Sequence, residues 1–469
     1  MRAGASMSVK ILEHALPFDF KKHVNAHWHA LEHRSCPPFL LTRDNFGAAT
    51  NVWRLDRLDE QGDPQRILLS APLPPYDTGY IISPNQRFLA IAHSDDSQFD
   101  WRVYDLSTGS LIPESGLRGH GHLRSYWENA GEFTALTLKE GDEDIILRYT
   151  LTGEGKLEQV GCAVPATGPE PTDSFGLEWL AKDGSIFTSS SVIPSWVRPA
   201  RRPHSIAYYP PCSDRTTIPA VLDLPFTTEG KDAIFSKHFI QISETNFAFV
   251  VEENEWGTDM NPIAAVSTVR LITCTACPTP GDKPGISLSW TARFEHAIDQ
   301  ITYVPSLSTG TIVVRGKWHA PYPYPGIGPR GPNKRILTFL DVSTGTLLRQ
   351  TEQTINPSSS SAYSCIGPNL VVYDALVQVP WLYAIPLARV MEIGLEGIEN
   401  SEGQTDVQVT RLEVGNGPDP WNSKVRRSAE QGRWKWVKNT EVLPDGKLVL
   451  FSDRGPEFWV LDHAAINCV

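Results

Sequence analysis

The sequence predicts an all-β fold in which a unit of four short antiparallel strands repeats along the chain. Its 35 glycines and 37 prolines in 469 residues suit many short strands joined by turns. Its 14 tryptophans and 13 tyrosines, against 4 methionines, favour the pleated surfaces of strands. The third observation is a recurring pattern: an apolar strand, a turn, a second strand, a variable loop and two further strands.

The clearest copy of this unit spans residues 80–113. Tight turns are expected there at Ser83-Pro84-Asn85 and at Ser107-Thr108-Gly109, and the phrase YDLSTGSL beginning at Tyr104 recurs as LDVSTGTL at Leu340. Related halves of the unit occupy residues 127–160, 179–191, 241–253, 303–315, 366–375 and 442–462. Radial repetition of such a unit predicts a β-propeller, which leaves no long sheet edge exposed.

We expect one propeller domain over residues 1–469, with seven or eight blades and eight preferred. The last unit lacks a fourth strand, and the segment 7–16 is expected to pair there and close the ring. A pair of β-sandwiches is the alternative architecture, but it would not explain the shared unit. The only helical stretch expected is 387–397. The expected blades are 24–75, 76–115, 116–160, 165–225, 230–295, 296–352, 353–412, and 430–469 together with 7–16.

Composition and charge exclude several classes of partner. The net charge of −12 argues against a nucleic-acid partner, which would require a basic face. No apolar run reaches about 18 residues, so no membrane span is expected. The N-terminus lacks the apolar core of a signal peptide. Together with seven scattered cysteines and no usable glycosylation sequon, this favours an intracellular and cytoplasmic location.

No cofactor or metal is expected. Cys274 and Cys277 have the spacing of a zinc-binding pair, but no second pair completes four ligands, so structural cysteines are the preferred interpretation. His120 and His122 lack further ligands in the same way. The sequence contains no nucleophile elbow, no P-loop and no dinucleotide fingerprint.

The long loops of the predicted blades are expected on one face of the ring. The connections between second and third strands emerge on that face with those leading to the next blade, and here they are long and rich in Trp, Arg and His. The longest are 189–205, 252–262, 316–334, 117–127 and 415–436. A tryptophan in such a loop can instead wedge between blades.

These loops supply the candidate site. Indole and phenol rings suit a flat apolar small molecule, and Arg or His can hold a carbonyl or enolate oxygen. Positioning two reactants in this way can accelerate a reaction without a cofactor. The candidate catalytic residues are Arg198, His319 and Arg124. The candidate substrate-binding residues are Trp196, Trp256, Trp318, Tyr322, Tyr324, Trp127, Trp421 and Trp434.

The repeated units loosely resemble the WD-repeat superfamily, although the repeated Gly-His opening and Trp-Asp closing pairs are missing. The overall profile, Trp-rich and propeller-like without a nucleophile, resembles the cofactor-free hetero-Diels–Alderases of fungal tropolone-sesquiterpenoid pathways. That resemblance implies an intermolecular cyclase of secondary (meroterpenoid) metabolism that joins a tropolone quinone methide to a humulene-type olefin. The alternative is a non-catalytic intracellular scaffold for protein–protein interaction, and a glycan-binding propeller is a third hypothesis.

Overall fold

The computed structural model describes the chain in segments from residue 8 to residue 461. The described residues are 8–9, 12–13, 29–30, 39–43, 50–58, 64–71, 80–94, 98–113, 118–120, 122–130, 132–140, 143–164, 174–191, 204–211, 213–224, 232–256, 262–275, 283–308, 310–318, 333–355, 362–366, 368–374, 381–399, 410–414, 437–442, 448–452 and 458–461.

The described strands form eight sheets. The first sheet contains β3 (His29–Ala30), β4 (Phe39–Arg43), β5 (Thr50–Leu58) and β6 (Pro64–Leu68), and the second contains β7 (Tyr80–Ile82), β8 (Phe88–Ser94), β9 (Gln98–Asp105), β10 (Ser110–Leu111) and β11 (Arg118–His120). The third sheet contains β12 (His122–Ala130), β13 (Phe133–Glu140), β14 (Glu143–Leu151) and β15 (Leu157–Ala163). The fourth contains β16 (Ser174–Leu180), β17 (Ile186–Ser191), β18 (His204–Tyr209) and β19 (Ala220–Leu224).

The other four sheets complete the ring and include the helix. The fifth sheet contains β20 (Asp232–Gln241), β21 (Asn246–Trp256), β22 (Pro262–Thr275) and β23 (Gly285–Phe294), and the sixth contains β24 (Ala297–Val304), β25 (Thr311–Trp318), β26 (Asn333–Asp341) and β27 (Leu347–Ile355). The seventh sheet contains β28 (Ala362–Ile366), β29 (Asn369–Asp374), β30 (Trp381–Pro386) and β31 (Thr410–Val414), together with β1 (Ser8–Val9). The eighth contains β32 (Val437–Val442), β33 (Leu448–Ser452) and β34 (Phe458–Leu461), together with β2 (Leu12–Glu13). Helix α1 (Leu387–Glu399) lies between β30 and β31.

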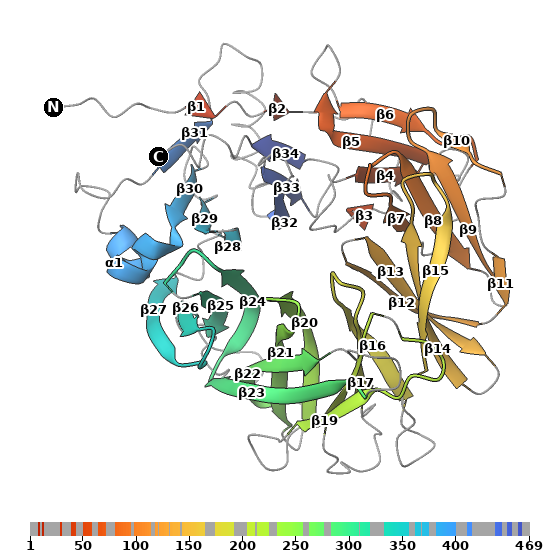
Figure 1. Cartoon of the computed structure of the whole chain (residues 1–469). Helices are drawn as coiled ribbons and strands as arrows, with labels where there is room; N and C mark the ends of the chain where they lie inside the picture. Colours follow the sequence, from red (N-terminus) through yellow and green to blue (C-terminus); the bar gives the residue numbers. More distant parts are fainter. Residues whose placement is uncertain are drawn as a thin grey trace.

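Successive sheets stand around a ring (Figure 1). The first strand of one sheet contacts the first strand of the next from β12 to β16, β20, β24, β28 and β32, which places the first strands innermost. Within each sheet the consecutive strands pair antiparallel, as in the β20–β23 ladder. The fold is a β-propeller. The number of sheets among the described residues does not fix the blade count of the whole chain, so eight blades and their boundaries stay predictions.

Both faces of an inner sheet are buried, and this explains the apolar runs of the sequence. In the second sheet, Ile81 and Ala90 belong to a core shared with β13 and β14, whereas Ile82 and Leu89 belong to a core shared with β5 and β6. Alternate residues of a strand point to opposite faces. Each sheet is therefore packed between its two neighbours. Its strands do not alternate between apolar and polar residues, because both faces are buried.

The N-terminal segment pairs where the sequence predicts it. β2 runs antiparallel to β34 and supplies the fourth strand of the last sheet. β1 also pairs in parallel with β31 at the edge of the preceding sheet, a contact that the sequence analysis does not anticipate.

The outer strand of the second sheet is broken in two, which corrects the expected loop at 117–127. β10 pairs with Tyr104 and Asp105, and β11 pairs with residues 98–100 of the same strand, β9. Pro113 lies between β10 and β11. Proline has no backbone N–H to donate to the ladder, which accounts for the interruption. His120 therefore lies on a strand, β11 (Arg118–His120), instead of in the expected loop.

The helix expected at 387–397 is confirmed as α1, which occupies the connection between the third and fourth strands of its sheet. Its backbone is interrupted at Gly394, whose φ of +79° and ψ of 170° are not helical. Leu387, Val390 and Leu395 belong to a core shared with β25, β26 and β29. The Leu395 backbone N–H donates to Thr351 Oγ1 at 2.7 Å, and this hydrogen bond ties the helix to β27.

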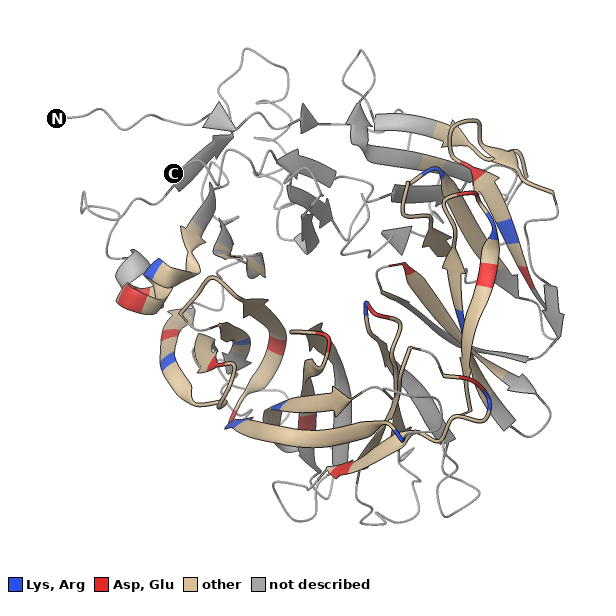
Figure 2. Ribbon diagram, in the orientation of Figure 1, with Lys and Arg blue, Asp and Glu red and all other residues tan. Residues whose placement is uncertain are grey.

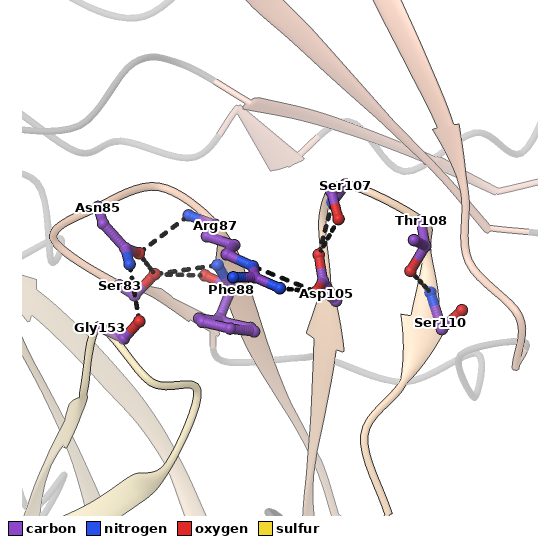
Figure 3. A network of polar contacts seen from close by, with 9 residues as sticks. All are labelled: Ser83, Asn85, Arg87, Phe88, Asp105, Ser107, Thr108, Ser110 and Gly153. Atoms are coloured by element: carbon purple, nitrogen blue, oxygen red, sulfur yellow. Dashed lines mark hydrogen bonds and ion pairs between the residues drawn. The ribbon is translucent and has the colours of Figure 1, made fainter.

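The repeated Asp-x-Ser-Thr-Gly phrase forms the same turn in two sheets. The Asp105 carboxylate accepts hydrogen bonds from the Ser107 backbone N–H at 2.8 Å and from the Ser107 hydroxyl at 2.5 Å (Figure 3). Asp341 accepts the same two bonds from Ser343, at 2.9 and 2.5 Å. Asp and Ser side chains are suited to such local bonds. The sequence repeat is therefore a repeat of turn geometry.

Short turns also join neighbouring sheets. Asn85 Nδ2, in the β7–β8 turn, donates to the Gly153 carbonyl of the β14–β15 turn at 2.7 Å (Figure 3). Two residues further on, Gly155 has a φ of +82°, and a Cβ there would lie 2.8 Å from the Phe88 ring. The turn of one sheet thus rests on the side chains of the sheet before it.

The same arrangement recurs around the ring. A Cβ added at Gly184 would lie 3.2 Å from the ring of Phe133 in the preceding sheet. A Cβ added at Gly345 would lie 2.5 Å from the ring of Trp290. Both glycines have positive φ, +87° and +68°. Only glycine combines this backbone with so close an approach. The aromatic rings therefore fix the spacing between sheets on the short-turn face.

Replacing Gly345 with alanine is expected to lower the free energy of unfolding by about 1–3 kcal/mol, because the backbone is left-handed and the Cβ would collide with Trp290. The midpoint of urea unfolding measures the loss. Gly153→Ala is the control, because its Cβ would approach only the Asn85 side chain, at 3.3 Å. Equal midpoint shifts for the two variants would contradict the account.

Candidate functional site

The β21–β22 hairpin projects from the long-loop end of its sheet. The outer strand β23 stops at Phe294, opposite Ser267, whereas β21 and β22 continue to pair as far as Trp256 and Pro262. The expected loop 252–262 is therefore shorter than predicted, because Glu252–Trp256 are strand. This extension carries the candidate residue Trp256 to the tip of a paired hairpin.

The next sheet ends its central hairpin with a tryptophan at the same end. Trp318 is the last residue of β25 and pairs with Lys334 of β26. Hairpins between second and third strands all point to one face of a propeller, so Trp256 and Trp318 belong to the same face of neighbouring sheets. This placement of Trp256 and Trp318 rests on the positions of their backbones.

Two other candidate residues lie on a strand rather than in a loop, which corrects the expectation. Arg124 and Trp127 belong to β12, the innermost strand of its sheet, where they pair with Thr137 and Leu136. The register shifts between them, so a bulge replaces the expected loop. The remaining candidates lie outside the described residues: Trp196, Arg198, His319, Tyr322, Tyr324, Trp421 and Trp434.

A polar cluster that the sequence analysis missed lies at the same end of the β24–β27 sheet. His296 follows β23 and precedes β24, and only 8% of its surface is exposed. Its imidazole meets the Phe294 ring edge-on, with centroids 5.4 Å apart. Gly316 provides the room, since a Cβ there would lie 2.2 Å from His296 Cδ2. An isolated histidine in no motif gives no sequence signal.

An ion pair completes this cluster. Lys334 Nζ lies 2.8 Å from Glu352 Oε2, linking β26 to β27. The hydrogen bond from Lys334 holds the pKa of the Glu352 carboxyl below its usual value. Burial lowers the pKa of His296, and the carboxylates of Glu352, Asp299 and Glu295 oppose the shift without overcoming it. The imidazole is therefore neutral at pH 7.

Two acidic groups, Glu252 and Asp299, come from neighbouring sheets. Glu252, on β21, has a raised pKa because it is partly buried and because the Asp299 carboxylate of β24 repels its charge. This is the usual consequence of bringing two carboxyl groups together. Among the described residues, no group of three or more His, Cys, Asp or Glu side chains is arranged to hold a metal.

The cysteine that raised the zinc question is a core residue. Cys274 packs in the core shared by the β16–β19 and β20–β23 sheets. Burial raises the pKa of its thiol to about 12, with the Asp183 carboxylate adding to the shift. Cys277 lies outside the described residues. A thiol that resists ionisation is a poor metal ligand, which favours the structural interpretation of Cys274.

Positively and negatively charged residues are interspersed along the described part of the chain (Figure 2). Lys and Arg residues are scattered among Asp and Glu around the ring (Figure 2). In the part of the chain that the structure describes, no helix has the length and apolarity needed to cross a bilayer.

Comparison with known proteins gives remote structural likenesses. No family model and no curated protein matches the sequence. The Dos1 propeller is 10% identical over 90% of this chain and 88% of its own, with a TM-score of 0.43. The C-terminal WD40 domain of Sif2 is 11% identical over 98% and 99%, with a TM-score of 0.39. A prolyl endopeptidase is 11% identical over 74% of this chain, which spans 46% of that protein, with a TM-score of 0.36. The fold assignment rests on the sheets and their packing rather than on these likenesses.

Cys274 and Cys365 are expected to resist iodoacetamide at pH 8 in the native protein, because burial raises both thiol pKa values to about 12. Mass spectrometry of tryptic peptides checks this, with guanidinium-unfolded protein as the control in which both become alkylated. Rapid native alkylation of Cys274 would contradict its place in the core.

Between pH 7 and pH 5, the free energy of unfolding is expected to fall less in His296→Gln than in the wild-type protein. The folded-state pKa of His296 lies below the ordinary value of 6.5, so the unfolded chain binds a proton first and stability falls as the pH drops below 6.5. Urea midpoints at several pH values measure the slope. A slope unchanged by the substitution would show that His296 titrates alike in both states.

Proposed function

We propose that this propeller binds a protein partner with its long-loop face and acts as a scaffold. The observation that carries the proposal is the pair of hairpins that end in Trp256 and Trp318 on one face of neighbouring sheets. Tryptophan is enriched among residues that dominate binding energy at interfaces. On the opposite face, the described turns at Asp105–Gly109 and Asp341–Gly345 are short and internally bonded.

The charge of the projecting hairpin suggests the chemistry of that partner. Glu252, Glu253 and Glu255 precede Trp256 on β21, and the chain as a whole carries −12. Acidic residues close in sequence to an aromatic anchor can complement a surface rich in Lys and Arg and increase the rate of encounter with it. We therefore propose a basic partner surface.

Alanine at Trp256 or Trp318 is expected to weaken partner binding by about 30-fold or more, if each indole anchors the interface at about 2 kcal/mol. Affinity purification of the full chain, followed by titration of the recovered partner, measures the change. Leu347→Ala is the matched control, because this exposed side chain lies on the outer strand β27, away from the hairpin tips.

Two results would count against the scaffold. One is a partner that binds both tryptophan variants with the affinity it has for the wild-type protein and that crosslinks to the short-turn face. The other is an association rate that Glu253→Lys combined with Glu255→Lys does not lower, because reversing two charges beside the anchor must slow a basic partner.

The second candidate is the cofactor-free cyclase implied by the resemblance of the sequence. The same two tryptophans favour it, since indoles brought to one face can stack on an apolar substrate. Arg198, His319 and Arg124 are its proposed catalytic residues, and Trp196, Tyr322, Tyr324, Trp127, Trp421 and Trp434 its further binding residues. Incubation with a tropolone quinone methide and a humulene-type olefin tests it. Product above the spontaneous rate, lost in Arg198→Ala, supports it, and a rate equal to background excludes it for this pair.

A further inference from the structure

A half-open cavity of about 510 Å³ lies between two neighbouring sheets and extends to Lys334, which pairs with Trp318. One wall is the end of β23, and the other is formed by alternate residues of β26 together with β27. Its volume lies within the range of small-molecule sites, roughly 300–1,000 Å³.

The cavity exists because one side chain of β23 is small. Trp290, Ala292 and Phe294 alternate along that strand and face the next sheet. Trp290 closes one end, with its ring against Gly345 and its Nε1 donating to the Val342 carbonyl at 3.0 Å. Phe294 packs against His296 at the other end. Ala292, between them, leaves the space open.

Two buried polar atoms on the wall make no hydrogen bond within the protein. These are Nε2 of His296 and Oγ1 of Thr338, whose residues are 8% and 1% exposed. A buried polar atom without a partner costs about 1–3 kcal/mol. Such atoms are rare in native proteins, and an explanation for each is expected. Here both belong to residues that line one cavity.

The charges around the cavity are already neutralised in pairs. Lys334 pairs with Glu352 at 2.8 Å, and Arg293 pairs with Glu295 at 2.9 Å. The remaining wall contributes apolar side chains, among them Ile336, Leu340 and Leu347. A charged ligand would have to break one of these pairs, whereas a neutral ligand would not.

We propose that this cavity binds a small neutral molecule that has an apolar body and a hydroxyl or carbonyl group. The apolar body covers Ala292, Ile336 and Leu340, and the polar group hydrogen-bonds to Thr338 Oγ1 or to His296 after a side-chain rotation turns that buried atom toward the cavity. The cavity extends to the end of the sheet that carries Trp318, but its occupant is a small molecule, and neither proposal requires the other.

The test uses 2-naphthol, a neutral fluorescent probe with an apolar body and one hydroxyl group. Wild-type protein is expected to bind it saturably at one site, and naphthalene, which lacks the hydroxyl, about threefold to tenfold more weakly. Ala292→Leu fills the cavity and is expected to weaken binding at least about tenfold. Thr338→Val keeps the shape but removes the hydroxyl, for a loss of about threefold to tenfold.

Matched controls come from other sheets. Ala220, half-buried on the outer strand β19, becomes Leu without entering the cavity. Thr188, also buried with an unpartnered hydroxyl, becomes Val. Both controls are expected to bind as wild type does, and thermal melting establishes that all four variants fold. No saturable binding by wild type, or equal losses in Ala292→Leu and Ala220→Leu, would overturn the proposal.

Discussion

The contact between a left-handed glycine turn and an aromatic ring of the preceding sheet sets the geometry of this propeller. Gly155, Gly184 and Gly345 each bring backbone with positive φ against a ring of the neighbouring sheet, and at Gly155 and Gly345 an added Cβ would lie less than 3.0 Å from that ring. Sheets buried on both faces have little else to fix their spacing, because hydrophobic packing is non-directional. The glycine contacts supply the direction, and the apolar cores fill the space that they define.

This constraint makes the two faces of the ring unequal. On one face, Asp105 and Asp341 organise turns that are short, internally bonded and pressed against the next sheet. On the other face, the β21–β22 hairpin runs beyond its outer strand and ends at Trp256. A rigid face supports a variable one, which is the usual arrangement for binding loops on a scaffold. Between the β20–β23 and β24–β27 sheets, the small side chain of Ala292 stands between Trp290 and Phe294 and leaves a cavity.

Local signals were enough to predict the parts of the fold that depend on local chemistry. The turn at Ser107-Thr108-Gly109, the helix beginning at Leu387 and the strand at the N-terminus that closes the ring all follow from turn residues, periodicity and the missing strand of the last unit. The sequence predicts a blade over 76–115 followed by a loop at 117–127, whereas β11 pairs with β9 after the break at Pro113.

The candidate site was harder to predict because it depends on which residues meet across sheets. Trp318 and Trp256 could be assigned to one face from topology alone, whereas Arg124 and Trp127 could not be told from loop residues across a β-bulge. His296 belongs to no motif, and its burial follows from Gly316 on another strand. Contacts between sheets leave no pattern in a single sequence, so the cavity and its unpartnered polar atoms emerge only in three dimensions.

A double-mutant cycle between Gly345 and Trp290 tests the interlock most directly. Gly345→Ala, Trp290→Leu and the double variant are compared with wild type by urea unfolding, so that backbone strain cancels and only the contact remains. The account predicts a coupling of about 0.5–3 kcal/mol, with alanine better tolerated once the indole is gone. Strictly additive free energies would contradict it.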